Sequence, residues 1–506
     1  MKKRMVFLLT VLMFVISVTG FAKSKELVIA VNANFISLDP HNLSDTLSGT
    51  AAATMYEGLL KYESDMSLKP LLAKNYKVSD DGLTYTFEIR KGIKFSDGTI
   101  LDAKAVKYNF DRVMDKNKNL RRRRNFLTVK NVEAIKTNTV KIVLNTPYAP
   151  MLNRIASLRI ISPAALKKYG DQGIITHPVG TGPYVYDKWV QGDKLVIRKN
   201  NSYWGQKPKV DKVTFKPVME NGSRIAMLQT GEADFIYPMP TEQVRRIKGN
   251  KNIEIMTGFS TIARYVTLNT NKDVFKNKKV RQAINYAVNK KAYAQVVKSG
   301  YLVPLTSPVP EALEYHADQT PYTFNLKKAK QLMKEAGYPN GFTTSIWGSN
   351  NTEDMKGMQF INQQLAQIGI KVEVMPMEEG TLANSIYGAQ TPEEAKINMW
   401  YVNWSSFDID GATKNLFHSD FIPPVSANTA YYTNSKVDKM IEDGAIETNS
   451  KKRAKIYAEM QSAIWNDAPW IFLGSDQLVS AKRKTTKNVY VMPDGAINLE
   501  KANTTK

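Results

Sequence analysis

Hydrophobic and polar residues recur along the first half of the chain with the periods of strands and helices. Residues 26–31 form a short aliphatic run, which predicts a buried strand. Residues 83–89 alternate between apolar and polar side chains, as in a half-buried strand, and residues 139–144 are another strand candidate. Asp102 precedes an apolar stripe of helical period and predicts an N-cap. Helical spacing over residues 51–62 predicts a further helix.

The second half predicts an α/β arrangement of alternating helices and strands. Gly369 is expected to end one helix directly before a strand at 370–374. The expected helices are residues 274–293, 325–337, 358–368, 436–448 and 450–466. Strands near Val479 and over 489–491 have no expected partner in their own neighbourhood. We therefore expect them to pair with the N-terminal half, so that the chain crosses between two lobes more than once.

The N-terminus has the pattern of a secretory signal peptide. Three basic residues precede an apolar run over residues 5–18, and small residues follow near Ala22. The run is short for a membrane-spanning helix, and no later stretch is longer. Cleavage near Ala22 would lower the net charge from +23 to +20, because Lys2, Lys3 and Arg4 are lost. The sequence thus predicts an exported, soluble protein.

Composition excludes several kinds of chemistry. The chain has 506 residues and no cysteine, which rules out thiolate metal sites, disulfides, cysteine nucleophiles and a lipid anchor on cysteine. Its four histidines lack metal-binding spacing, and no nucleophile or phosphate-loop motif occurs, so we expect neither an enzyme nor a cofactor or metal. Basic residues are dispersed, and only residues 121–124 form a dense cluster. Nucleic acid is therefore not an expected partner.

Aromatic residues are abundant and gather near acidic ones. Trp400, Tyr401 and Trp404 lie close to Asp408 and Asp410. Aromatic walls with a few fixed charges suit a cleft for a small polar ligand. The alternative is that most of these aromatic residues fill the core.

Ordered motifs along the mature chain resemble the periplasmic peptide-type solute-binding proteins of ABC importers. They include Leu-Asp-Pro at 38–40, Tyr-Glu-Gly-Leu at 56–59, Ser-Asp-Asp-Gly-Leu-Thr-Tyr at 79–85 and Lys-Phe-Ser-Asp-Gly-Thr at 94–99. Segments 179–184, 227–234, 280–287 and 335–338 continue the series. Within the family, residues 42–48, 264–265, 363–370 and 469–471 are similar to the glutathione-binding subgroup.

The resemblance implies a two-lobed α/β periplasmic binding protein fold of the peptide-binding type, with a hinge. The implied first lobe covers residues 23–263, with a subdomain inserted at about 56–175. Residues 264–477 would form the second lobe, and residues 478–506 would return to the first. The lobes would close over a ligand at their interface.

Site residues carry over from the family only where its motifs match. Asp408 stands near the position of the aspartate that receives the ligand's amino group in peptide-binding relatives, close to Trp404, and Asp410 is a weaker substitute. Trp347 and Trp404 are implied as ligand-binding residues of the cleft. The loop after Trp347 lacks the arginine that binds the C-terminal carboxylate in dipeptide binders.

Three more residues are implied by the glutathione-binding subgroup and by the family's first lobe. Arg122 matches an arginine of that subgroup and is implied as a carboxylate clamp, or else it is a solvated turn residue. Asp45 and Thr46 are implied to face the cleft from the first lobe.

The resemblance therefore implies a monomeric periplasmic protein that captures glutathione for ABC permease subunits in the inner membrane. Glutathione has two carboxylates and one ammonium, which suits a basic protein with arginine and aspartate in its cleft. The alternatives are a dipeptide-, oligopeptide- or haem-binding member, or a basic surface adhesin.

Overall fold

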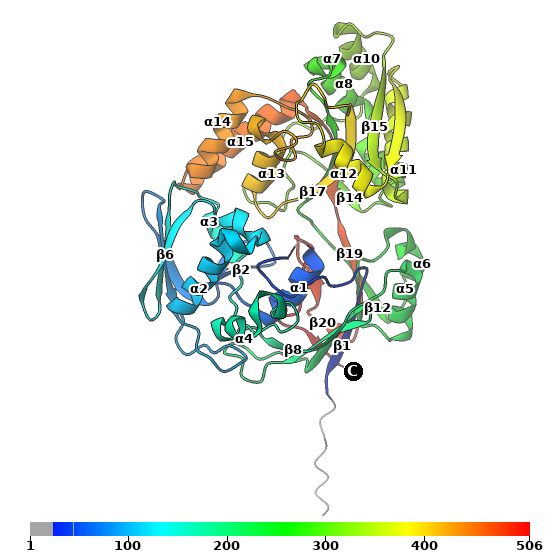
Figure 1. Cartoon of the computed structure of the whole chain (residues 1–506). Helices are drawn as coiled ribbons and strands as arrows, with labels where there is room; N and C mark the ends of the chain where they lie inside the picture. Colours follow the sequence, from blue (N-terminus) through cyan, green and yellow to red (C-terminus); the bar gives the residue numbers. More distant parts are fainter. Residues whose placement is uncertain (1–23, 44, 506) are drawn as a thin grey trace, which may run out of the picture.

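The computed structural model describes residues 24–43 and 45–505 and has two lobes (Figure 1). The predicted signal peptide, residues 1–22, lies outside the described residues. Each lobe contains its own central sheet and buried apolar clusters. Every helix in the described part of the chain is too short or too polar to span a lipid bilayer.

The first lobe is built on a seven-stranded sheet of order β12-β19-β11-β1-β10-β9-β8. The predicted first strand is β1, which lies parallel to both β10 and β11. The strands are β1 Glu26–Val31, β8 Tyr184–Val190, β9 Lys194–Lys199, β10 Lys212–Pro217, β11 Phe235–Tyr237, β12 Ile253–Gly258 and β19 Leu478–Arg483. The helices around it are α1 Thr46–Met55, α4 Pro163–Gly173, α5 Asn221–Thr230 and α6 Val244–Ile247, with η3 at Thr241–Gln243.

A smaller antiparallel sheet of order β4-β5-β7-β6 stands beside it and has its own apolar cluster. The predicted strand at 83–89 is β5, and Asp102 caps α2 by accepting the N–H of Ala105 at 2.8 Å. The strands of this sheet are β4 Ala73–Val78, β5 Thr84–Ile89, β6 Val129–Lys136 and β7 Thr139–Leu144, while β2 Leu60–Tyr62 and β3 Leu68–Pro70 form a separate two-stranded sheet. The helices are α2 Ala103–Met114, η1 Lys116–Lys118, η2 Arg121–Phe126 and α3 Met151–Ala156.

The second lobe is built on a six-stranded sheet of order β14-β18-β13-β17-β15-β16. Its strands are β13 Ile262–Leu268, β14 Leu302–Pro304, β15 Thr343–Ser349, β16 Lys371–Met377, β17 Met399–Ser405 and β18 Trp470–Asp476. Its helices are α7 Asp273–Lys276, α8 Lys278–Ala287, α9 Lys290–Val296, α10 Leu326–Glu335, α11 Thr352–Ala366, α12 Glu379–Tyr387, α13 Ile409–Phe417, α14 Ser435–Ile446 and α15 Ser450–Asp467, with η4 at Ser419–Phe421.

The chain passes between the two main sheets at residues 259–261 and again at Gln477. The strand predicted near Val479 is β19, which pairs with β11 and β12 of the first lobe. The strand predicted at 489–491 does have a local partner, because β21 (Tyr490–Val491) forms a hairpin with β22 (Ile497–Asn498). Nearby, β20 (Thr486–Lys487) pairs with β23 (Asn503–Thr504). The exact lobe and subdomain boundaries given above remain predictions.

Three predicted helices are wrong in their limits. The helix expected over 358–368 is α11, which begins earlier, at Thr352, and ends at Ala366. The helix expected over 51–62 is α1, which starts earlier because Asp45 caps it and ends at Met55, and Leu60–Tyr62 is a strand. The helix expected over 274–293 is three helices, α7, α8 and α9. The side chains of Asn277 and Asn289 cap α8 and α9. These caps divide the segment into separate helices, although the apolar periodicity alone predicts one continuous helix.

Candidate functional site

The two lobes meet at an ion-pair cluster between α3 and the start of α13 (Figure 1). The Arg154 guanidinium contacts the Asp408 carboxylate at 2.8 Å and the Asp410 carboxylate at 3.2 Å. Tyr148 donates its hydroxyl to Asp410 at 2.7 Å. Arg154 and Tyr148 belong to the first lobe and both aspartates to the second, so this cluster holds the lobes together.

Asp408, predicted to receive a ligand's ammonium, has partners within the protein. Its carboxylate caps α13 by accepting the N–H of Gly411 at 2.8 Å, and it pairs with Arg154. Burial raises the pKa of Asp408, an effect that Arg154 opposes. An arriving ammonium would therefore compete with Arg154, and the role of Asp408 toward a ligand stays a prediction.

His41 brings two arginines from separate segments to one place. Its ring Nε2 lies 2.8 Å from the carbonyl oxygen of Arg159, and its own carbonyl accepts the N–H of Arg122 at 3.1 Å. Burial lowers the pKa of His41 to about 4, so the ring is neutral. The neutral ring can donate from Nε2 to Arg159 while Nδ1 accepts from Arg112, which lies 2.8 Å away.

The guanidinium groups of Arg122 and Arg159 have no carboxylate partner. Among residues 24–43 and 45–505, neither forms an ion pair or a side-chain hydrogen bond, and the Nε of Arg122 is buried without an acceptor. Burial and, next, the neighbouring charge of Arg159 lower the pKa of Arg122 to about 10. Burial also lowers the pKa of Arg159. The site therefore presents two desolvated cations that no carboxylate contacts within the described residues, although the charges of Glu57 and Asp494 act on Arg159, and this arrangement favours an anionic ligand.

Asp45 and Thr46 lie at the start of α1, beside the turn that joins β21 and β22. Asp45 caps α1 by accepting the N–H of Ser48 at 2.7 Å, and its second carboxylate oxygen is buried without a partner. Thr46 is exposed, and a Cβ built on Gly495 would lie 3.5 Å from its Cγ2. The acidic residue of this turn, Asp494, is therefore close to α1. Sequence reasoning did not identify Asp494 or Arg159.

The two predicted tryptophans lie on different strands of the second lobe. Trp347 is on β15, is buried in a small apolar cluster, and its indole Nε1 has no hydrogen-bond partner. Trp404 is on β17 and packs partly against another cluster. In the described part of the chain, neither indole forms a hydrogen bond or ring contact with Asp408 or the two arginines. Their ligand contacts stay predictions.

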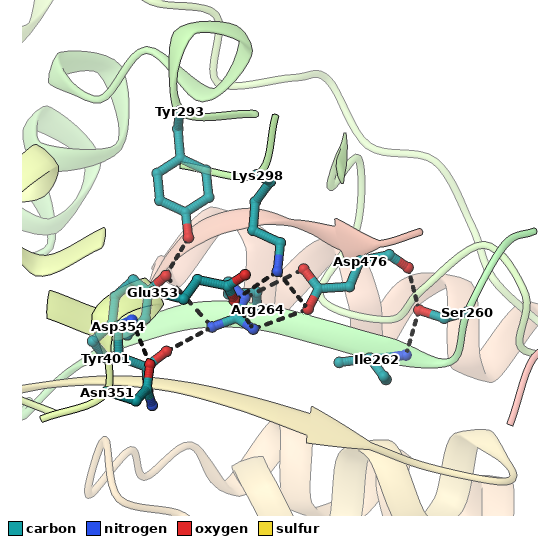
Figure 2. Close-up of polar contacts among 10 residues, drawn as sticks. All are labelled: Ser260, Ile262, Arg264, Tyr293, Lys298, Asn351, Glu353, Asp354, Tyr401 and Asp476. Carbon is teal, nitrogen blue, oxygen red and sulfur yellow. Dashed lines mark hydrogen bonds and ion pairs between the residues drawn. The ribbon is translucent and has the colours of Figure 1, made fainter. Parts of the chain in front are cut away.

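A buried charge network lies where the chain crosses between the lobes (Figure 2). Arg264 on β13 pairs with Asp476 at 2.9 Å, at the end of β18. Lys298 contacts Asp476 at 3.3 Å and Glu353 at 2.7 Å, and Arg264 also contacts Glu353 at 3.1 Å. The hydroxyl of Ser260, in the other crossing segment, donates to the carbonyl of Asp476. These contacts tie both crossing segments to each other and to the second lobe.

Arg264 also reaches the start of α11. Asp354 contacts it at 3.2 Å, and the backbone N–H of Asp354 donates to the Asn351 side chain, which caps the helix (Figure 2). Because α11 follows β15, the strand that carries Trp347, this charge network is continuous with the loop after Trp347. No group of three or more His, Asp or Glu side chains within the described residues converges as a metal site.

Comparisons with known proteins match this architecture. The family model described as "Bacterial extracellular solute-binding proteins, family 5 Middle" matches residues 67–421. The glutathione-binding protein GsiB of Escherichia coli (strain K12) is 42% identical over 485 residues, which covers 95% of this chain and 94% of that protein. GsiB of Pectobacterium atrosepticum is 42% identical over 489 residues, covering 96% and 95%.

Solved structures agree at the level of the fold. HbpA2 from Haemophilus parasuis has a TM-score of 0.85 at 27% identity, covering 95% of this chain and 100% of that one. DppA from Helicobacter pylori, in complex with the peptide STSA, has a TM-score of 0.76 at 29% identity, covering 94% and 98%. The full-length identity, the family match and the shared two-lobed fold lead to one conclusion: the chain belongs to family 5 of the bacterial extracellular solute-binding proteins.

Proposed function

We propose that this solute-binding protein captures glutathione in the periplasm by closure of its lobes and delivers it to the permease of an ABC importer. The observation that carries the proposal is the identity of 42–43% over 95% of the chain to proteins named for glutathione binding. The unpaired guanidinium groups of Arg122 and Arg159 support it, because glutathione carries two carboxylates.

The route to the periplasm and the partners are part of the same proposal. The sequence pattern of residues 1–22 supports export with cleavage near Ala22, and the absence of cysteine supports a protein without a lipid anchor on that residue. The partners would be permease subunits in the inner membrane, reached by the closed, loaded form.

Calorimetry on the protein expressed without residues 1–22 tests the ligand. We expect reduced glutathione to bind with micromolar or tighter Kd and dipeptides such as Met-Leu to bind at least tenfold more weakly. A dipeptide or haem that binds tenfold tighter than glutathione would overturn the ligand assignment. Salt-dependent retention on heparin with no small-molecule ligand would favour the adhesin alternative.

A further inference from the structure

Three buried side chains, those of Asp39, Arg112 and His41, form a chain of contacts that ends at the two arginines without carboxylate partners. The Arg112 guanidinium, on α2, contacts the two carboxylate oxygens of Asp39 at 2.7 and 3.2 Å, and it lies 2.8 Å from Nδ1 of His41. We propose that His41 is a positioning residue of the ligand site, whose ring and carbonyl hold Arg159 and Arg122 where they bind carboxylates of the ligand.

The partners of the His41 ring decide which of its nitrogens carries the hydrogen. An arginine guanidinium has only N–H donors, so Nδ1 must accept from Arg112. A carbonyl oxygen only accepts, so Nε2, 2.8 Å from the carbonyl of Arg159, must donate. Both bonds exist together only in the neutral ring. Burial, together with the charges of Arg112 and Arg122, outweighs the opposing charge of Asp39 and lowers the pKa of His41 to about 4, which keeps the ring neutral.

The main chain at His41 holds the short helix η2, which carries Arg122. The N–H of Arg122 donates to the carbonyl of His41 at 3.1 Å, and the N–H before it donates to the side chain of Asn42 at 3.2 Å. His41 is itself fixed from the other side, because its N–H donates to the Asp39 carboxylate at 3.0 Å. One residue therefore sets the main-chain positions of both Arg122 and Arg159.

Glu57 is the acidic side chain whose charge acts most strongly on Arg159, yet its carboxylate is engaged by neutral donors. It accepts from the hydroxyls of Thr181 at 2.8 Å and Tyr203 at 2.7 Å, and from the indole N–H of Trp204 at 2.8 Å. Among residues 24–43 and 45–505, no ion pair joins Glu57 to Arg159. The guanidinium of Arg159 therefore stays available to a ligand.

The consequence for the ligand rests on the proposed function. Glutathione has two carboxylates, and two guanidinium groups bind both well only when the protein already holds them at the right spacing. Loss of the His41 bonds frees the main chain at Arg159 and at Arg122, so the gain from the second carboxylate is lost. His41 should therefore control the preference for ligands with two carboxylates, in addition to its part in stability.

Calorimetry with glutathione and its glycine amide, which has one carboxylate fewer, tests this role. The wild-type protein should bind glutathione about tenfold or more tighter than the amide. His41→Leu removes both ring bonds, so it should weaken glutathione binding about tenfold and reduce the preference over the amide to less than about threefold. His41→Gln keeps one donor and one acceptor on its amide and should restore the preference. The control is Val140→Ala, in the apolar cluster of the smaller sheet, which lowers the stability of the same lobe and should leave both affinities unchanged.

A spectroscopic measurement needs no variant and covers the case of poorly folded ones. In NMR spectra of wild-type protein with isotope-labelled histidine, His41 should have a neutral ring with its hydrogen on Nε2 between about pH 5 and about pH 7.5. A hydrogen on Nδ1, a charged ring at pH ~6, or a wild-type preference over the amide in His41→Leu would overturn the inference. Equal binding of glutathione and its amide by the wild-type protein would also overturn it. If the wild-type protein binds no glutathione at all, it is the proposed function that fails.

Discussion

The inter-lobe cluster around Arg154 allows one quantitative prediction about closure. Arg154→Met removes the cation shared by Asp408 and Asp410, whose side chains are 5% and 6% exposed. Two buried carboxylates would then face each other with only the smaller effect of the Arg453 charge on Asp408 to balance them. Removing one partner of a buried pair costs about 3–5 kcal/mol. Because opening the lobes returns both aspartates to water, this cost falls on the closed form rather than on the folding of either lobe.

The expected result is a shift toward the open form. At about 1.4 kcal/mol per factor of ten, the ratio of closed to open molecules should fall about a hundredfold or more. The apparent affinity for glutathione should fall with the fraction of competent molecules. Small-angle X-ray scattering should record a larger radius of gyration for Arg154→Met, while thermal unfolding of the lobes changes little. Arg198→Met, at an exposed ion pair with Asp187, is the control and should change neither quantity.

The pH dependence of the variant separates charge from packing. Burial already raises the pKa of Asp408, and loss of Arg154 should raise it further. A carboxyl whose pKa is higher in the closed form favours that form when protonated. Closure of Arg154→Met should therefore recover as the pH falls from 7.5 toward 5. A variant as compact as the wild-type protein at pH 7.5, with unchanged glutathione affinity, would refute this account of the cluster.

Three further predictions concern stability. Asp476→Asn should lower the free energy of unfolding by about 3 kcal/mol. Burial raises the pKa of Asp476, but its two cationic neighbours outweigh burial and hold the pKa below the usual value. The carboxylate therefore contributes its full stability above pH ~4 and loses it as acid protonates the group. Equal urea midpoints for the variant and the wild-type protein would contradict this prediction. His41 has a pKa of about 4 in the folded protein, so on acidification the imidazole is protonated in the unfolded chain before it is protonated in the folded one. About 3 kcal/mol of stability should therefore disappear as the pH falls from about 6.5 to 4. His41→Gln should flatten this pH dependence of stability in urea titrations, and an unchanged slope would count against the prediction. Gly180→Ala should lower the free energy of unfolding by about 2 kcal/mol or more, because the new Cβ would lie 2.3 Å from the Met55 carbonyl oxygen. The control Gly49→Ala, in open space within α1, should be neutral or stabilising. Similar melting temperatures for the two variants would disprove the clash.

Local patterns in the sequence determined the types of most elements and the class of the protein. Alternation identified β5, and Asp102 marked the start of α2, because side-chain period and capping are properties of a few neighbouring residues. The ordered motifs identified the family, and the comparisons with known proteins confirm that family. Helix limits failed at α1, which a cap before the apolar stripe begins, at the start of α11, and at α7–α9, where caps inside an apolar stripe divide it.

Only the tertiary structure decided which charges are free. In the sequence, Asp408 is as good a candidate for an ammonium as any aspartate, yet folding places Arg154 against it. Arg159 left a faint signal, a single charge within the apolar run 155–161, and Asp494 looks like an ordinary turn residue. The surroundings of Arg159 are set by packing between segments far apart in the chain, as the contact of its carbonyl with His41 shows. Sequence fixes the charge of each side chain, but burial and long-range packing decide which charges are neutralised within the protein and which are left for a ligand.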